Sequence, residues 1–76
     1  GHNAVIGDGC FIIACAQISG SAQLGEKGWF GPNSSVKNGI RVGAGVLIGL
    51  GTVVTKSLPD NVVAAGCPAR IIRTKN

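Results

Sequence analysis

The chain is short, weakly charged and basic, and these properties exclude several classes of protein. It has 76 residues, of which 13% are charged and 45% are apolar, and its formal net charge is +4. A chain of this length forms at most one small domain with a thin core, so partners are expected. No apolar run is long enough to span a bilayer and no signal-peptide pattern is present, so the sequence predicts a soluble protein without a membrane partner.

The cysteine content predicts a reduced, cytoplasmic setting. The three cysteines, Cys10, Cys15 and Cys67, cannot all pair within the chain, and none stands in a Cys-x-x-Cys spacing. Nucleic-acid binding is not expected, because the basic residues are not interleaved with aromatic ones. Several of the basic residues crowd the C-terminal end, where they could attract phosphates or simply form a solvated tail.

A six-residue repeat runs through most of the chain. A small or branched residue stands two places before each large apolar one, and residues two apart on a strand share a face. Both sets are therefore expected to point inward from short strands. The large apolar residues recur without insertion or deletion at Ile6, Ile12, Ile18, Leu24, Phe30, Val36, Val42, Ile48 and Val54.

Two-residue corners are predicted between these strands. Five of the nine second corner residues are Gly or Asn, which accept a positive φ most readily, and Pro32-Asn33 fits a type II turn. A chain that turns after every short strand without changing register cannot form ordinary hairpins, but it can coil into a parallel β-helix. The period alone fixes neither the number of strands in each coil nor the handedness.

Residues 6 to 59 resemble the hexapeptide repeats of the bacterial acyltransferase superfamily. The resemblance implies an all-β fold, a left-handed parallel β-helix shaped as a triangular prism of about three coils, with residue i lying over residue i+18. The coils would span residues 6 to 23, 24 to 41 and 42 to 59. It assigns residues 1–59 to the β-helix and 60–76 to a short C-terminal tail that packs on the prism or on a neighbouring subunit.

This stacking sorts the outward-facing residues onto three faces, of which only the second is apolar. The prism already buries its inward residues, so the apolar stripe is expected to meet another subunit, and the superfamily's homotrimers are what the resemblance implies. The alternative is that the C-terminal tail folds back over the stripe. The predicted contact residues are Phe11, Ile13, Trp29 and Leu47.

The first residues of the chain fit a catalytic motif of the superfamily. The run His2-Asn3-Ala4-Val5-Ile6-Gly7 matches the pattern H-[ND/E]-x-x-[IV]-G, and stacking places Gly20 in the corner column of His2. The resemblance implies that His2 is the general base and that the backbone N–H of Gly20 stabilises the oxyanion. Amino-sugar acetyltransferases have a carboxylate at the position of Asn3. The asparagine here is what the lipid A N-acyltransferase has at that position. The alternative is a vector-derived or merely exposed histidine.

The end of the chain points to the co-substrate. The segment LPDNVVAAGCPARIIR, residues 58 to 73, is similar to the closing segment P-x-N-x-V-x-x-G-x-P-A-[KR]-x-I of acetyl-CoA-dependent sugar acetyltransferases. The resemblance implies acetyl-CoA, with its pantetheine arm along a corner between subunits and its phosphates near basic residues. Phe11 replaces a second histidine of the amino-sugar branch. The corresponding positions here are Phe11, Gly31, Pro32, Gly49 and Leu50 for the arm, and Arg70 and Lys56 for the phosphates.

The predicted function is transfer of an acetyl group from acetyl-CoA to an amino or hydroxyl group of a sugar or nucleotide sugar. A metal enzyme on the same prism is not expected, because one histidine cannot supply the three that the carbonic anhydrases of this fold use. A structural prism that trimerises without catalysis stays open as the alternative. The acceptor sugar, the choice between O- and N-acetylation, and the presence of a further domain before residue 1 also stay open.

Overall fold

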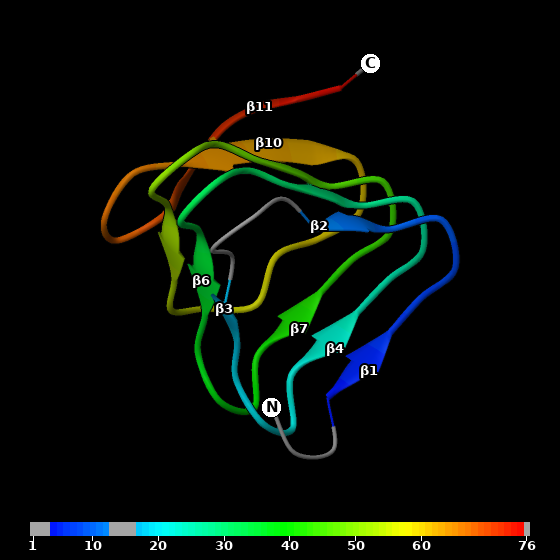
Figure 1. Ribbon diagram of the computed structural model, residues 1–76. Helices are drawn as coiled ribbons and strands as arrows, with labels where there is room; N and C mark the ends of the chain where they lie inside the picture. Colours follow the sequence, from blue (N-terminus) through cyan, green and yellow to red (C-terminus); the bar gives the residue numbers. More distant parts are fainter. Residues whose placement is uncertain (1–3, 13–16, 76) are drawn as a thin grey trace.

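The computed structural model describes residues 4–12 and 17–75, and its regular secondary structure there consists of short strands (Figure 1). Nine of the strands have two residues each and follow one another at the predicted six-residue interval. The last two are longer. The strands are β1 (Val5–Ile6), β2 (Phe11–Ile12), β3 (Gln17–Ile18), β4 (Gln23–Leu24), β5 (Trp29–Phe30), β6 (Ser35–Val36), β7 (Arg41–Val42), β8 (Leu47–Ile48), β9 (Val53–Val54), β10 (Val62–Ala65) and β11 (Arg70–Thr74).

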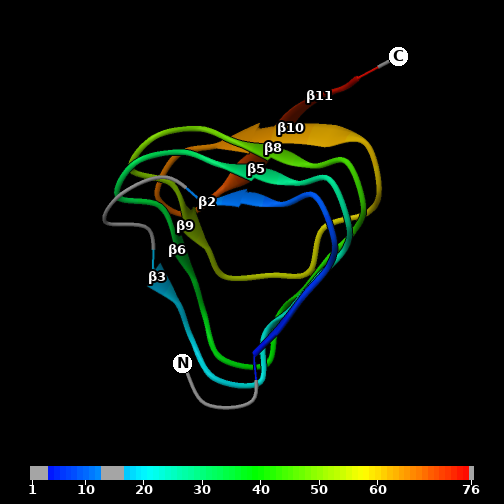
Figure 2. The same cartoon turned by 45° about the vertical axis from the view of Figure 1, so that its right-hand side comes forward.

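The strands stack into three sheets that form the sides of a triangular coil, and strands β1 to β9 pair in parallel (Figure 2). The first sheet has the order β1-β4-β7 and the third has the order β3-β6-β9. In the first sheet Val5 pairs with Gln23, and Gln23 pairs with Arg41. Each partner is 18 residues further along, so three hexapeptides make one coil. The predicted all-β prism of about three coils is therefore confirmed.

The second sheet is extended by the end of the chain. Its order is β11-β10-β8-β5-β2, with β10 parallel to β8 and β11 antiparallel to β10. Val63 pairs with Leu47 at an offset of 16 residues, so the last turn is two residues shorter than the others. Strands β10 and β11 extend this sheet at its edge, beyond β8. They do not lie over its outer face, and Trp29 stays 38% exposed there.

The corners adopt the left-handed backbone conformation that the Gly and Asn pattern predicts. Asn33 has a φ of 58°, as a type II turn after Pro32 requires, and Gly51 has a φ of 65°. Two corners reach the same conformation without Gly or Asn, because Ser21 and Lys27 have φ values of 62° and 59°. The coil therefore imposes this conformation even on residues that accept it at a cost.

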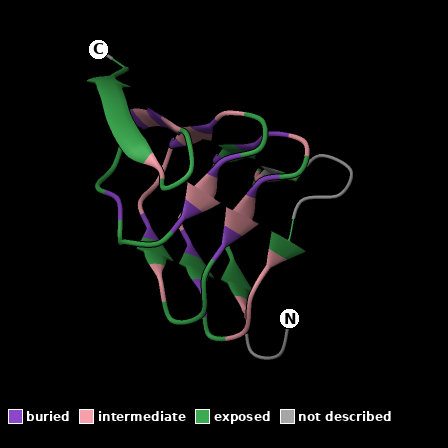
Figure 3. Ribbon diagram, turned by 90° about the vertical axis from the view of Figure 1, so that its left-hand side faces the viewer, coloured by how far each residue is buried: buried purple, intermediate pink, exposed green. Residues whose placement is uncertain are grey.

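The core is one cluster of buried hydrophobic residues, and the buried segments of the coil are coloured purple in Figure 3. Phe30 and Ile48 are fully buried, as the repeat predicts. In the first coil the equivalent residues Ile6 and Ile12 are 46% and 37% exposed, since no described strand pairs with β1 or β2 on the side away from β4 and β5. Glycine is needed where successive coils meet, and a Cβ on Gly25 would lie 2.5 Å from the backbone nitrogen of Ala44.

Candidate active site

The corner column that contains Gly20 is held by a backbone hydrogen-bond ladder. The amide of Gly39 donates to the carbonyl of Gly20 at 3.3 Å, and the same pattern joins the amide of Gly51 to the carbonyl of Pro32 at 2.8 Å. At these corners the second corner residue donates to the first corner residue one coil earlier, and Lys27 and Gly45 donate in the same way to Asp8 and Glu26. The remaining members of the predicted catalytic set, His2 and Asn3, lie outside the described residues.

The amide of the first corner residue is left out of this ladder. Among the described residues, the N–H groups of Gly20, Asn38 and Leu50 make no hydrogen bond. The amide of Ala44 is different, because it donates to the Asp60 carboxylate at 2.8 Å. Within residues 4–12 and 17–75 the Gly20 N–H therefore has no acceptor, and an oxyanion donor requires such an unpaired N–H.

The corner between the second and third faces brings together four of the residues expected at the pantetheine arm. Gly31 is buried, and a Cβ there would lie 2.8 Å from the backbone nitrogen of Leu50. Leu50 itself is 77% exposed, next to Gly49 and one coil from Pro32. The result is a low backbone surface beside an exposed apolar side chain. Phe11 pairs with Trp29 through its backbone, but its side chain is outside the described part of the structure.

The two residues predicted to meet phosphates lie together. Lys56 and Arg70 line one hollow of about 460 Å³, which Ser57 also lines. The amide of Ala69 donates to the carbonyl of Val53 at 2.8 Å, which fixes the start of β11 beside this hollow. Two cations on one concave surface suit a phosphate-bearing ligand.

The two predicted halves of the site are on different corners of one chain. Gly20 lies at the corner before the first face, whereas Pro32 and Leu50 lie at the corner before the third face. The sheet β3-β6-β9 separates these two corners (Figure 2). A single chain therefore does not place the Gly20 amide beside the pantetheine corner.

The described residues show neither a metal cluster nor a membrane span. Over residues 4–12 and 17–75 no group of three or more His, Cys, Asp or Glu side chains is placed to hold a metal ion. In the same part of the chain, no helix is long and apolar enough to cross a membrane.

Comparison with known proteins gives consistent relatives, although no protein-family model matches the chain. Galactoside O-acetyltransferase of Escherichia coli (strain K12) is 43% identical over 53 residues, which cover 70% of this chain and 26% of that protein. The structure of PerB from Caulobacter crescentus, in complex with CoA and GDP-perosamine, superposes with a TM-score of 0.91 at 34% identity. This match covers 92% of this chain and 34% of PerB. These relatives are hexapeptide-repeat acetyltransferases, so the resemblance predicted from the sequence is confirmed.

A second structural relative agrees with this family and its fold. A galactoside acetyltransferase in complex with coenzyme A superposes with a TM-score of 0.82 at 29% identity, over 96% of this chain and 46% of that one. The β-helix is left-handed, as the hexapeptide resemblance implies. The matched residues span 26% of the length of the E. coli relative.

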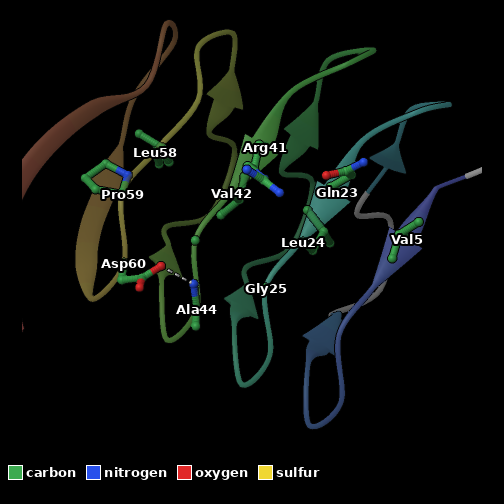
Figure 4. Close-up of a pocket in the computed structure, with 11 residues that line it drawn as sticks. Val5, Gln23, Leu24, Gly25, Arg41, Val42, Ala44, Leu58, Pro59 and Asp60 are labelled. Atoms are coloured by element: carbon green, nitrogen blue, oxygen red, sulfur yellow. Dashed lines mark hydrogen bonds between the residues drawn. The ribbon is translucent and has the colours of Figure 1, made fainter.

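Three polar residues that were not predicted as site residues line a second hollow. Gln23, Arg41 and Asp60 line a hollow on the first face of the hexapeptide prism (Figure 4). The repeat identifies Gln23 and Arg41 as outward-facing, but it cannot bring Asp60 to them, because that placement depends on the shortened last turn. A break in the six-residue period after Val54 is the signal that could have pointed to this part of the surface.

Proposed function

We propose that this chain carries the catalytic segment of an acyltransferase, which moves an acetyl group from acetyl-CoA to an amino or hydroxyl group of a sugar. The observation that carries the proposal is the likeness to PerB, which covers 92% of this chain and whose structure holds CoA and GDP-perosamine. The coenzyme A complex of a galactoside acetyltransferase supports the same donor.

His2 is the proposed general base, and Asn3 beside it takes the place of a carboxylate. The imidazole of His2 removes the proton from the acceptor N–H or O–H while the nitrogen or oxygen attacks the thioester carbonyl carbon. The developing oxyanion accepts a hydrogen bond from the Gly20 amide, which no described group of the chain uses. The C–S bond then breaks, its electron pair leaves with sulfur, and protonated His2 returns the proton to the CoA thiolate.

The pantetheine arm of acetyl-CoA is proposed to lie along the corner formed by Gly31, Pro32, Gly49 and Leu50, with Phe11 at its end. The low backbone at the two glycines admits the arm, and the exposed side chain of Leu50 gives it an apolar contact. Arg70 and Lys56 supply cations for the phosphates from the hollow that they share. These are the groups that a CoA ester needs along its length.

The proposed assembly is a homotrimer in which each site is shared by two chains. The Gly20 corner and the Pro32 corner of one chain are separated by a sheet, so a complete site takes one corner from each of two subunits. The second face offers the contact, because Trp29 is exposed on it and Leu47 is only half-buried. Phe11 and Ile13 complete the proposed contact, although the side chain of Phe11 and the whole of Ile13 lie outside the described residues.

An acetyl-transfer assay with acetyl-CoA and amino-sugar or galactoside acceptors tests the proposed function. We expect turnover in the natural protein and a loss of about 10²- to 10⁴-fold in His2→Ala, because general-base catalysis contributes that much. As a control, CoA should raise the melting temperature of both proteins equally, since the variant removes no binding group. Full activity of His2→Ala would refute the role of this residue. Absence of both transfer and a CoA-induced shift would favour the structural prism.

A further inference from the structure

The first face of the prism carries a hollow of about 510 Å³ that the proposed CoA site does not use. This volume falls in the range of small-molecule sites, roughly 300–1,000 Å³. Its lining combines donors from two neighbouring strands with a carboxylate from the last turn (Figure 4). The polar groups therefore converge on one space from two sides.

The donor side consists of Gln23 and Arg41. These residues are register partners on β4 and β7, so their side chains leave the same face from adjacent strands, which lie about 4.8 Å apart. Among the described residues the Arg41 guanidinium makes no hydrogen bond or ion pair. The backbone of Arg41 is held, because its amide donates to the Ser57 hydroxyl at 3.2 Å and its carbonyl accepts the Leu58 amide at 3.0 Å. A guanidinium fork beside an amide suits the oxygens of a phosphate or a carboxylate.

The acceptor side consists of Asp60, and the floor between the two sides is glycine. One oxygen of the Asp60 carboxylate accepts the Ala44 amide at 2.8 Å, which fixes the carboxylate at the rim. Its other oxygen makes no hydrogen bond among the described residues and suits a hydroxyl or ammonium donor. A Cβ on Gly43 would collide with the Asp60 carboxylate, so this floor stays open only with glycine.

The hollow lies next to the proposed reaction centre. Gln23 follows Gly20 by three residues, and Arg41 follows Asn38, the next member of the same corner column, by the same interval. A ligand on the first face would therefore extend from the corner that carries the Gly20 amide. The cofactor hollow lined by Lys56 and Arg70 is a separate concavity with different lining residues, apart from Leu58.

We infer that this hollow binds the acceptor, and that the acceptor is a sugar carrying an oxyanion, either a phosphate or a carboxylate. The oxyanion lies against Arg41 and Gln23, and a hydroxyl or ammonium group of the sugar donates to Asp60. The inference rests on the proposed acetyl transfer for the identity of the ligand as an acceptor. The binding itself can be measured without turnover.

The test measures binding of sugar pairs that differ only in an oxyanion, without acetyl-CoA. The pairs are glucosamine 6-phosphate with glucosamine, and galacturonate with galactose. We expect one charged sugar to bind at least about tenfold more tightly than its neutral partner, since a hydrogen bond to a charged group contributes roughly that much. Arg41→Gln should abolish this preference and leave the affinity for the neutral sugars unchanged. The arm that shows the preference identifies phosphate or carboxylate.

Lys37→Gln is the matched control. Lys37 is an exposed cation at the end of the third face, so this substitution removes the same charge at a site away from the hollow. The Lys37→Gln variant should still bind the charged sugar more tightly than its neutral partner. Equal losses in Arg41→Gln and Lys37→Gln, or equal binding of charged and neutral sugars by the natural protein, would overturn the inference. Weaker binding of CoA by the Arg41→Gln variant would also overturn the inference. Arg41-dependent sugar binding with no acetyl transfer to any acceptor would refute the proposed function and leave the binding site standing.

Discussion

The corner that holds Gly20 and the corner that holds Pro32 follow the same six-residue pattern but present different chemistry. At the first, the leading residue is Gly20, whose amide has no partner among the described residues. At the second, the equivalent residue is Pro32, which has no amide hydrogen, and Leu50 one coil later is largely exposed. The repeat thus sets the backbone, and the leading corner residue decides what each corner offers. Gly20 offers an amide without a side chain, Pro32 offers no amide hydrogen, and Leu50 offers an amide beside an exposed apolar side chain.

The largest expected effect comes from making the first corner resemble the second. Gly20→Pro replaces the amide hydrogen with the proline ring, a change that we expect the coil to accept, because Pro32 already occupies the equivalent position and Gly20 has no positive φ. We expect turnover to fall about 10²- to 10³-fold, as for loss of one oxyanion donor, with an unchanged melting temperature. Steady-state kinetics and thermal unfolding measure the two quantities.

Two matched variants control for that substitution. Gly20→Ala keeps the amide hydrogen and should retain most of the activity. Asn38→Pro places proline at the same corner position one coil later, where the amide is also without a partner among the described residues, and should leave turnover unchanged. Equal losses in Asn38→Pro and Gly20→Pro would show that proline disturbs the coil, and the comparison of the two corners would fail.

A smaller effect on stability is expected from the second corner residues. Ser21, beside Gly20, has a φ of 62°, whereas Gly51, beside Leu50, has a φ of 65°. Ser21→Gly should stabilise the protein by roughly 0.5–1 kcal/mol by relieving the left-handed conformation, and Gly51→Ala should destabilise it by a similar or larger amount. The space around Gly51 is open, so crowding does not contribute. Chemical denaturation measures both changes, and a stabilising Gly51→Ala would contradict this explanation.

The stacking of the coils could be predicted from the sequence only by combining the six-residue period with the hexapeptide resemblance. The period predicts the strands and corners, including the positive φ of Asn33, whereas the offset of 18 between Val5 and Gln23 follows from the three hexapeptides per coil that the resemblance implies. The burial of each inward residue could not be predicted in the same way. Ile12 and Ile48 share a column, yet Ile12 is exposed and Ile48 is buried, since burial depends on the coils above and below.

The candidate site could be predicted only in part, for a similar reason. Gly31, Gly49 and Leu50 come together because they share a corner column, which follows from the period together with the three hexapeptides per coil that the resemblance implies. The contact of Lys56 with the hollow that contains Arg70 depends on the turn after β10, where the six-residue pattern has ended. The hollow beside Asp60 depends on the same loss of period. Sequence periodicity therefore predicts sites within the repeat better than sites at its end.

The most direct test of a site shared between two chains is a complementation measurement. His2→Ala inactivates the first corner, and Leu50→Glu places a charge in the proposed pantetheine corner, so each variant alone should be nearly inactive. When the two are co-expressed and purified together, about a quarter of the sites in a cyclic trimer should combine the two intact corners, and activity should return to roughly that fraction of the natural rate. Activity no greater than the sum of the two separate variants would contradict the shared site.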